Sequence, residues 1–243
     1  MMKKEKSACF VSRGWIFYIL LSIYGVAQAS NPNDMFGVWG GDTLQGDFKN
    51  LADHGDKVHW LIMNQTRTRE DSPAGSRFTE NLLFSQVGYQ FNKNMSAWLG
   101  YTHDWIKPLN HNTIEENRPY MDWLWNDSLM ENFKWMARTR MEARINQETG
   151  DDGYRARQLL QLNYALPQVK GLSLYVGDEV FFYLNANDFG KKGFTENRIF
   201  TGLSYQFNEP LGVDLGYMGQ YIDTKQGDNL MTNNLQVNFR YHF

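Results

Sequence analysis

The chain has 243 residues, of which 42% are hydrophobic and 15% aromatic, and its formal net charge is −3. Its mean hydropathy of −0.56 is too low for a bundle of membrane-spanning helices. The negative net charge argues against a broad nucleic-acid-binding surface. A polar average combined with many aromatic residues is typical of transmembrane β-barrels, because each strand of such a barrel is apolar on one face only.

The first residues predict an export signal. A basic segment at 3–13 precedes an apolar stretch at 15–27, and Ala27-Gln28-Ala29 fits a cleavage site. The apolar stretch is too short for a membrane-spanning helix, which needs roughly 20 residues. We therefore expect a signal peptide at 1–29, cleaved after Ala29. The only cysteine, Cys9, lies inside it, so we expect no disulfide, no metal site and no cofactor in the exported chain.

Residues 55–243 show the period-two alternation of β-strands throughout. The clearest run is 133–145, where apolar residues alternate with charged ones. The pattern predicts an all-β fold, an antiparallel up-and-down transmembrane barrel of about ten strands. We place the strands near 57–67, 77–91, 95–104, 115–126, 131–146, 153–165, 171–184, 193–207, 211–222 and 229–243.

The predicted connections alternate between short turns and longer polar loops. The short turns lie at 92–94, 126–128, 166–168 and 208–210, and the longer loops at 68–76, 105–114, 147–152, 185–192 and 223–228. In outer-membrane barrels the short turns face the periplasm and the long loops face outward. An even number of strands places both chain ends in the periplasm. Residues 30–54 are accordingly expected to be a lead-in or a plug, or else two short strands that make twelve.

The last strand carries the most specific pattern of the sequence. Leu235, Val237, Phe239 and Tyr241 alternate with polar residues up to the terminal Phe243. This resembles the C-terminal signal by which the barrel assembly machinery recognises outer-membrane barrels. The resemblance implies a bacterial outer-membrane protein, reached by Sec export, with outer-membrane lipid and lipopolysaccharide as its surroundings. We expect it to be a monomer.

An internal repeat links two parts of the predicted barrel. Residues 78–101 and 194–217 align without gaps at an offset of 116, with 12 identities in 24 positions. Each segment covers one strand, its short turn and the next strand. Duplication of a hairpin is a better explanation than convergence, because the register is kept over the whole length.

The inward faces of the strands collect charged residues. The alternation assigns nine basic and seven acidic side chains to the lumen, while the exported chain as a whole carries a net charge of −6. Arginine binds carboxylates and phosphates through two parallel hydrogen bonds and stays charged. The residues expected to line the lumen and contact a solute are Arg118, Arg138, Arg140, Glu142, Arg144, Arg155, Arg157, Glu179, Glu196 and Arg198.

Three functions fit this pattern. The first is a small porin-like channel for passive or selective diffusion of small anionic solutes. The second is a closed structural or adhesion barrel, in which a ladder of Glu–Arg pairs fills a narrow lumen. The third is a lipid-modifying enzyme of the outer wall, which the sequence favours least because His103 has no serine at a suggestive spacing. We therefore expect no enzyme and no catalytic residues.

Part of the chain resembles a known family. The run Arg138-x-Arg140-x-Glu142-x-Arg144, then Arg155-x-Arg157, Glu179, Glu196-Asn197-Arg198 and Leu215-Gly216-Tyr217, is similar to an outer-membrane barrel family catalogued only as a domain of unknown function. The resemblance spans roughly 58–222 and implies the barrel fold without an activity. A looser likeness, to small monomeric porins for acidic sugars and oligogalacturonate, implies about twelve strands.

Overall fold

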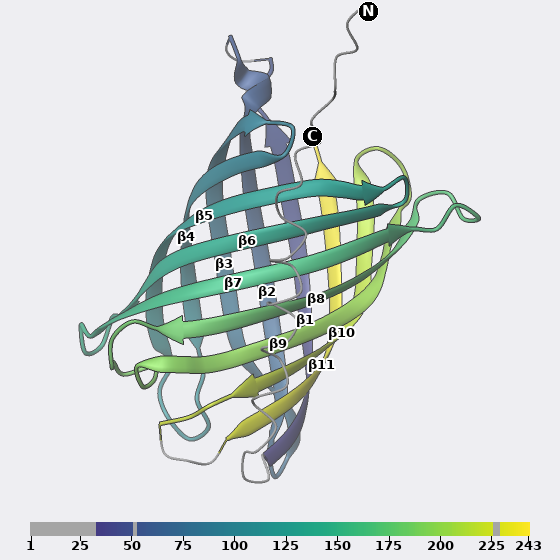
Figure 1. The fold of residues 1–243 in the computed structure, drawn as a ribbon. Coiled ribbons are helices and arrows are strands. Elements are labelled where there is room, and N and C mark those ends of the chain that lie inside the picture. Colours follow the sequence, from purple (N-terminus) through teal and green to yellow (C-terminus); the bar gives the residue numbers. More distant parts are fainter. Residues whose placement is uncertain (1–32, 51–52, 226–228) are drawn as a thin grey trace, which may run out of the picture.

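A computed structural model describes residues 33–50, 53–225 and 229–243 of the chain, so the predicted signal peptide lies outside the described residues. The described residues form one closed all-β barrel of eleven strands, as Figure 1 shows. The strands are β1 (Asn33–Asp47), β2 (Val58–Ser72), β3 (Gly75–Asn92), β4 (Met95–Ile106), β5 (Ile114–Met130), β6 (Phe133–Asn146), β7 (Asp152–Ala165), β8 (Leu172–Tyr183), β9 (Gly193–Gln206), β10 (Leu211–Ile222) and β11 (Leu230–His242). A single turn of 3-10 helix, η2 (Gly55–Lys57), precedes β2. Among these residues no helix is long and apolar enough to cross a lipid bilayer.

The expected barrel is confirmed, but the number of strands is eleven rather than ten or twelve. The additional strand is β1, one long strand where a lead-in, a plug or two short strands were expected. β1 pairs antiparallel with β2 and parallel with β11, with Val38 opposite Leu235 in the parallel register. In Figure 1 the purple β1 runs beside the yellow β11. The parallel pair gives both outer strands a partner, so the sheet has no open edge.

The two ends of the barrel differ, and we name them by their connections. The turn end carries the connections 48–57, 93–94, 131–132, 166–171 and 207–210 together with Phe243; the loop end carries 73–74, 107–113, 147–151, 184–192 and 223–229. The predicted alternation of short and long connections therefore holds in most places. It is wrong at 68–76, where β2 and β3 extend to a two-residue turn, and at 126–128, which belongs to β5.

The parity argument fails together with the strand count. β1 begins at the loop end, because Asn33 is aligned with Leu230, whereas Phe243 lies at the turn end next to Gln45. The prediction that both ends of the barrel domain lie on one side holds from β2 onward only. A closed barrel can contain an odd number of strands when its first and last strands pair in parallel, as β1 and β11 do.

The outer wall is apolar and the interior is charged. Outward positions such as Leu99 and Met121 are more than half exposed, while Glu116 and Asp122 inside are almost fully buried. Aromatic rings gather on the outside at the turn end. Their ring pairs include Phe91–Trp123, Trp125–Trp135, Phe133–Tyr164, Tyr205–Phe207 and Tyr241–Phe243.

The internal repeat corresponds to two hairpins of the barrel, β3–β4 and β9–β10. Both hairpins turn at the turn end, as the alignment of their sequences requires. The repeated Glu80 and Glu196 both face the lumen, where each forms an ion pair with an arginine. The duplication therefore preserved side-chain direction as well as sequence.

Candidate functional site in the barrel lumen

All ten side chains that the sequence analysis names as solute-contacting candidates face the barrel interior. They come from five adjacent strands, β5 to β9, because successive residues of a strand point to opposite faces of the sheet. Arg138, Arg140, Glu142 and Arg144 occupy alternate positions of β6, and Arg155 and Arg157 lie beside them on β7. The structure thus brings the predicted residues together into one charged interior.

Seven of these residues form one continuous network of ion pairs, which we call the long network. Arginine and glutamate alternate along it, with an arginine at each end: Arg138, Glu179, Arg157, Glu142, Arg155, Glu196 and Arg198. Its longest link, 3.8 Å, joins Arg155 to Glu196, and Arg138 lies 2.7 Å from Glu179. Four arginines meet three glutamates, so the long network carries one positive charge in excess.

The remaining lumen charges form balanced groups. Arg140 donates two hydrogen bonds of 2.6 Å to Asp122. Arg144 donates two hydrogen bonds of 2.6 Å to Glu116. Arg118 contacts both Glu116 and Asp104, so two arginines there balance two acids.

Two further ion pairs lie in the lumen. Arg67 lies 2.6 Å from Glu80, and Arg240 lies 2.9 Å from Asp214. These pairs are balanced as well, so among these ion-paired groups only the long network carries an excess of charge. Four other charged residues also line the loop-end cavity: Arg69, Asp188, Asp223 and Lys225.

Aromatic rings separate several guanidinium groups in the middle of the lumen. The Arg67 guanidinium carbon lies 3.7 Å from the centroid of the Trp39 ring, and that of Arg198 lies 5.0 Å from it. Arg198 also lies 4.6 Å from the ring centroid of Phe181. Trp39 and Phe181 are both buried. Such ring faces attract cations, and here they help to hold like-charged arginines close together.

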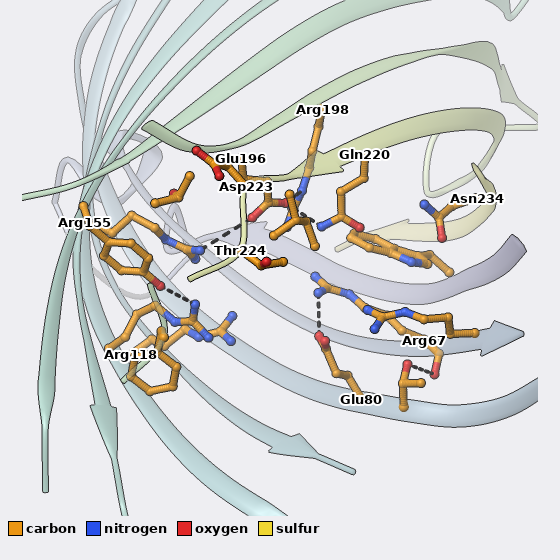
Figure 2. Close-up of a pocket in the computed structure, with 18 of the residues that line it drawn as sticks. Arg67, Glu80, Arg118, Arg155, Glu196, Arg198, Gln220, Asp223, Thr224 and Asn234 are labelled. Atoms are coloured by element: carbon orange, nitrogen blue, oxygen red, sulfur yellow. Dashed lines mark hydrogen bonds and ion pairs between the residues drawn. The ribbon is translucent and has the colours of Figure 1, made fainter. Parts of the chain in front are cut away.

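A cavity reaches into the barrel from each end. The loop-end cavity has a volume of about 510 Å³ and the turn-end cavity about 550 Å³. In the loop-end cavity, shown in Figure 2, the side chains of Arg67, Arg155 and Arg198 point inward from different strands. Both cavities are lined by the same central layer of five side chains: Trp39, Arg67, Arg118, Arg155 and Arg198. This arginine-rich layer therefore lies between the two cavities, and we call it the narrow layer.

Several residues of this layer and its surroundings are absent from the sequence-based list. Trp39 is absent because residues 30–54 were expected to be a lead-in, a plug or two short strands, although small and polar residues alternate there with Phe36, Val38 and Leu44. Arg67 and Asp104 were missed because they fall at the predicted ends of strands. Phe181 was missed because only charged residues were projected inward.

Chemistry other than ion pairing has little support in the lumen. Among the described residues no group of three or more His, Cys, Asp and Glu side chains is placed to hold a metal ion. His103 lies on the outer wall, where its Nδ1 is 2.8 Å from Asn117 Oδ1 and its Nε2 is 3.4 Å from Glu115. The arrangement in the lumen fits the binding or passage of an anion.

Comparison with known proteins finds a family model and solved structures that match. The sequence profile described as "Protein of unknown function (DUF2490)" matches residues 36–231. A search of curated proteins finds no match. Among solved structures, the NanC porin in a rhombohedral crystal form superimposes with a TM-score of 0.49 at 14% sequence identity, over 85% of this chain and 99% of that one.

Proposed function

The chain belongs to the DUF2490 family of proteins of unknown function, and from this premise we propose that it is a porin-like channel of the bacterial outer membrane. Its solutes are small anions, which cross the barrel by passive or selective diffusion. The proposal concerns the lumen alone and assigns no catalysis. Its two parts, the membrane setting and the anion path, depend on different residues.

The outer surface supports the membrane setting. Apolar side chains cover the wall, and the aromatic pairs at the turn end are placed like the girdle that outer-membrane barrels position at the lipid–water interface. The sequence adds an export signal and the terminal Phe243 pattern, which the assembly machinery would recognise. The turn end then faces the periplasm, and the loop end faces lipopolysaccharide and the exterior.

The main support for the proposed anion path is the excess positive charge of the long network. Its terminal Arg138 lines the turn-end cavity, while Arg198 at its other end lines both cavities. A solute that passes from one cavity to the other would therefore meet guanidinium groups of this network in the turn-end cavity and in the narrow layer itself. A positive excess attracts anions and repels cations, and guanidinium groups can replace part of an anion's hydration shell.

A second candidate is a closed barrel of structural function. Complete pairing favours it, since Arg140 with Asp122 and Arg144 with Glu116 each form two short hydrogen bonds in the interior. A lumen filled by such pairs would support the wall and leave no path for solutes. The two candidates differ in conductance, which is the quantity to measure.

The test is a recording of the refolded mature protein in planar bilayers, with the reversal potential measured in a salt gradient. We expect steady conductance with a preference for anions. Arg138→Gln should lower the anion-to-cation permeability ratio by about twofold or more, because it removes the excess charge from a partly desolvated path. The variant should still fold, because Glu179 keeps Arg157 as a partner.

Arg77→Gln is the matched control. Arg77 is paired with Asp71 at the loop end and lines neither cavity, so its loss should leave the selectivity unchanged. A folded wild-type barrel without conductance would contradict the channel and favour the closed barrel. Equal shifts in both variants would show that the long network does not set the selectivity.

A further inference from the structure

The turn-end cavity has a mainly polar lining that includes a group of apolar side chains. The polar residues include Arg138, Gln161 and Asn163 on the neighbouring strands β6 and β7. The apolar side chains, which we call the apolar wall, come from two strand pairs, β2–β3 and β9–β10, and stand there beside polar residues such as Gln86. They are Met63, Phe84, Phe200 and Met218. A path built only for small hydrophilic anions has no need of this apolar wall.

The apolar wall is built from two matching pairs. Met63 is the cross-strand partner of Phe84, and Met218 is the partner of Phe200. Phe84 and Phe200 occupy equivalent positions of the internal repeat, at the offset of 116. Both phenylalanines face the lumen and are only half buried. Duplication has thus placed two partly exposed rings at one cavity, where they remain available to a ligand.

Arg138 is the most exposed arginine of the long network, and it lines this cavity. Its guanidinium donates one hydrogen bond, from Nη2 to Glu179, and Glu179 also accepts two from Arg157. The Arg138 side chain is 22% exposed, against 12% or less for the other three arginines of the network. An incoming anion therefore finds Arg138 accessible and only partly neutralised.

We propose that the turn-end cavity binds an amphipathic anion, with its single acidic headgroup at Arg138 and its hydrocarbon body against Phe84, Phe200 and Met63. This rests on the proposed function, since it names the class of anion that the channel takes. A volume of about 550 Å³ lies within the range of small-molecule sites, and the lining combines many polar groups with a few apolar side chains. Monocarboxylates with a short alkyl chain or an aromatic ring fit this description better than polyhydroxylated acids.

The experiment is a calorimetric titration of the mature protein in lipid nanodiscs, with empty nanodiscs as the blank. The probes are butanoate, hexanoate and octanoate, together with glucuronate as a hydrophilic anion of the same charge and octanamide as a neutral counterpart. Each added methylene pair should raise the affinity by about tenfold, because burial of each methylene contributes roughly a three- to fourfold gain. Glucuronate and octanamide should bind more weakly than octanoate. Affinity that is independent of chain length, or glucuronate binding tighter than octanoate, would overturn the proposal.

Substitutions test the contributions of the apolar wall and of Arg138 separately. Phe200→Asn should weaken octanoate by about tenfold while it changes butanoate little, whereas Arg138→Gln should weaken every carboxylate. Met63→Gln tests the same apolar wall with a side chain of similar length, in case Phe200→Asn does not fold. Arg77→Gln, outside both cavities, should bind all probes like the wild type. Unchanged octanoate affinity in folded Phe200→Asn or Met63→Gln would count against the apolar wall as a binding surface.

Titration and conductance report on different claims. A barrel that conducts chloride with anion preference but shows no dependence on chain length refutes the amphipathic ligand and leaves the channel intact. A barrel that binds octanoate more tightly than butanoate but conducts nothing refutes the channel and supports the cavity as a binding site. Failure of one proposal is therefore distinguishable from failure of the other.

Discussion

Arg140 shows how a single residue is held in the lumen. It spans from β6 to Asp122 on β5 through two hydrogen bonds of 2.6 Å, and its guanidinium carbon lies 3.7 Å from the ring centroid of Tyr120. A side chain at position 100 would clash with that ring, since a Cβ there would lie 2.2 Å from Tyr120 Cζ. Gly100 thus makes room for the ring that supports the ion pair.

The loss of Arg140 should be costly because its partner is buried. Asp122 is only 2% exposed, so Arg140→Gln leaves a buried carboxylate without its cation. We expect the free energy of unfolding to fall by about 3–5 kcal/mol. This free energy of unfolding can be measured by urea-induced unfolding in lipid vesicles. The double variant Arg140→Gln/Asp122→Asn should recover most of the loss, because it removes the orphaned charge.

An exposed ion pair provides the comparison. Lys49 lies 3.7 Å from Asp47 at the turn end and is largely exposed, so Lys49→Gln should change the free energy of unfolding by less than about 1 kcal/mol. Equal effects of Arg140→Gln and Lys49→Gln would contradict the view that burial sets the strength of these pairs.

At the level of elements, β1 is the strand that distinguishes this barrel. It contributes Trp39 to the narrow layer, and it closes the sheet through its parallel pairing with β11. Its inward side bears glycines at 37 and 41, where an added Cβ would lie 2.5 Å from the Thr68 carbonyl oxygen and 2.7 Å from Asn238 Oδ1, respectively. Small residues there leave space beside Trp39 for neighbouring side chains.

The parallel register can be tested by a cysteine cross-link. Val38 and Leu235 are aligned partners that face outward, so Val38→Cys/Leu235→Cys should form a disulfide on mild oxidation in a Cys9→Ala background. The cross-linked protein should resist unfolding in detergent on electrophoresis. Val38→Cys/Val237→Cys is the matched control, because Val237 is aligned with Gly40 instead. Cross-linking of the control alone would show a different register.

Some elements could be predicted from sequence and others could not, for physical reasons. The strand β6 was predictable because Arg138, Arg140 and Arg144 alternate with apolar residues that need the opposite face. β1 was not, because its glycines weaken the alternation and a rule of even strand numbers excluded it. The ion-pair partners could not be predicted from the sequence either. Arg138 and Glu179 meet across β7, and such pairings depend on the stagger of all strands together.

The whole molecule has its polar and apolar groups arranged in reverse of a soluble protein. Buried residues include eleven charged side chains that face the lumen, whereas large apolar residues are exposed around the outside. The aromatic pairs mark the turn end. In the proposed outer-membrane setting, this asymmetry predicts a defined direction of the barrel.

The direction predicts which residues are reached from outside the cell. Lys192→Cys, at the loop end, should react with a membrane-impermeant maleimide on intact cells. Glu209→Cys, at the turn end, should react only after the outer membrane is permeabilised. Labelling of intact and of permeabilised cells is compared on blots of the protein. The chain without an introduced cysteine gives the background signal. The reverse pattern would show that the barrel is inserted the other way round.

The pairing of β1 with β11 also bears on the order of assembly. Every other pair of adjacent strands is consecutive along the chain, so each hairpin can form soon after its two strands are made. Asn33 and Leu230, in contrast, are nearly two hundred residues apart, and contacts of such separation form slowly. We therefore expect this seam to close last, with β1 and β11 each exposing an unpaired edge until then. Removal of the last strand should leave an open, aggregation-prone sheet.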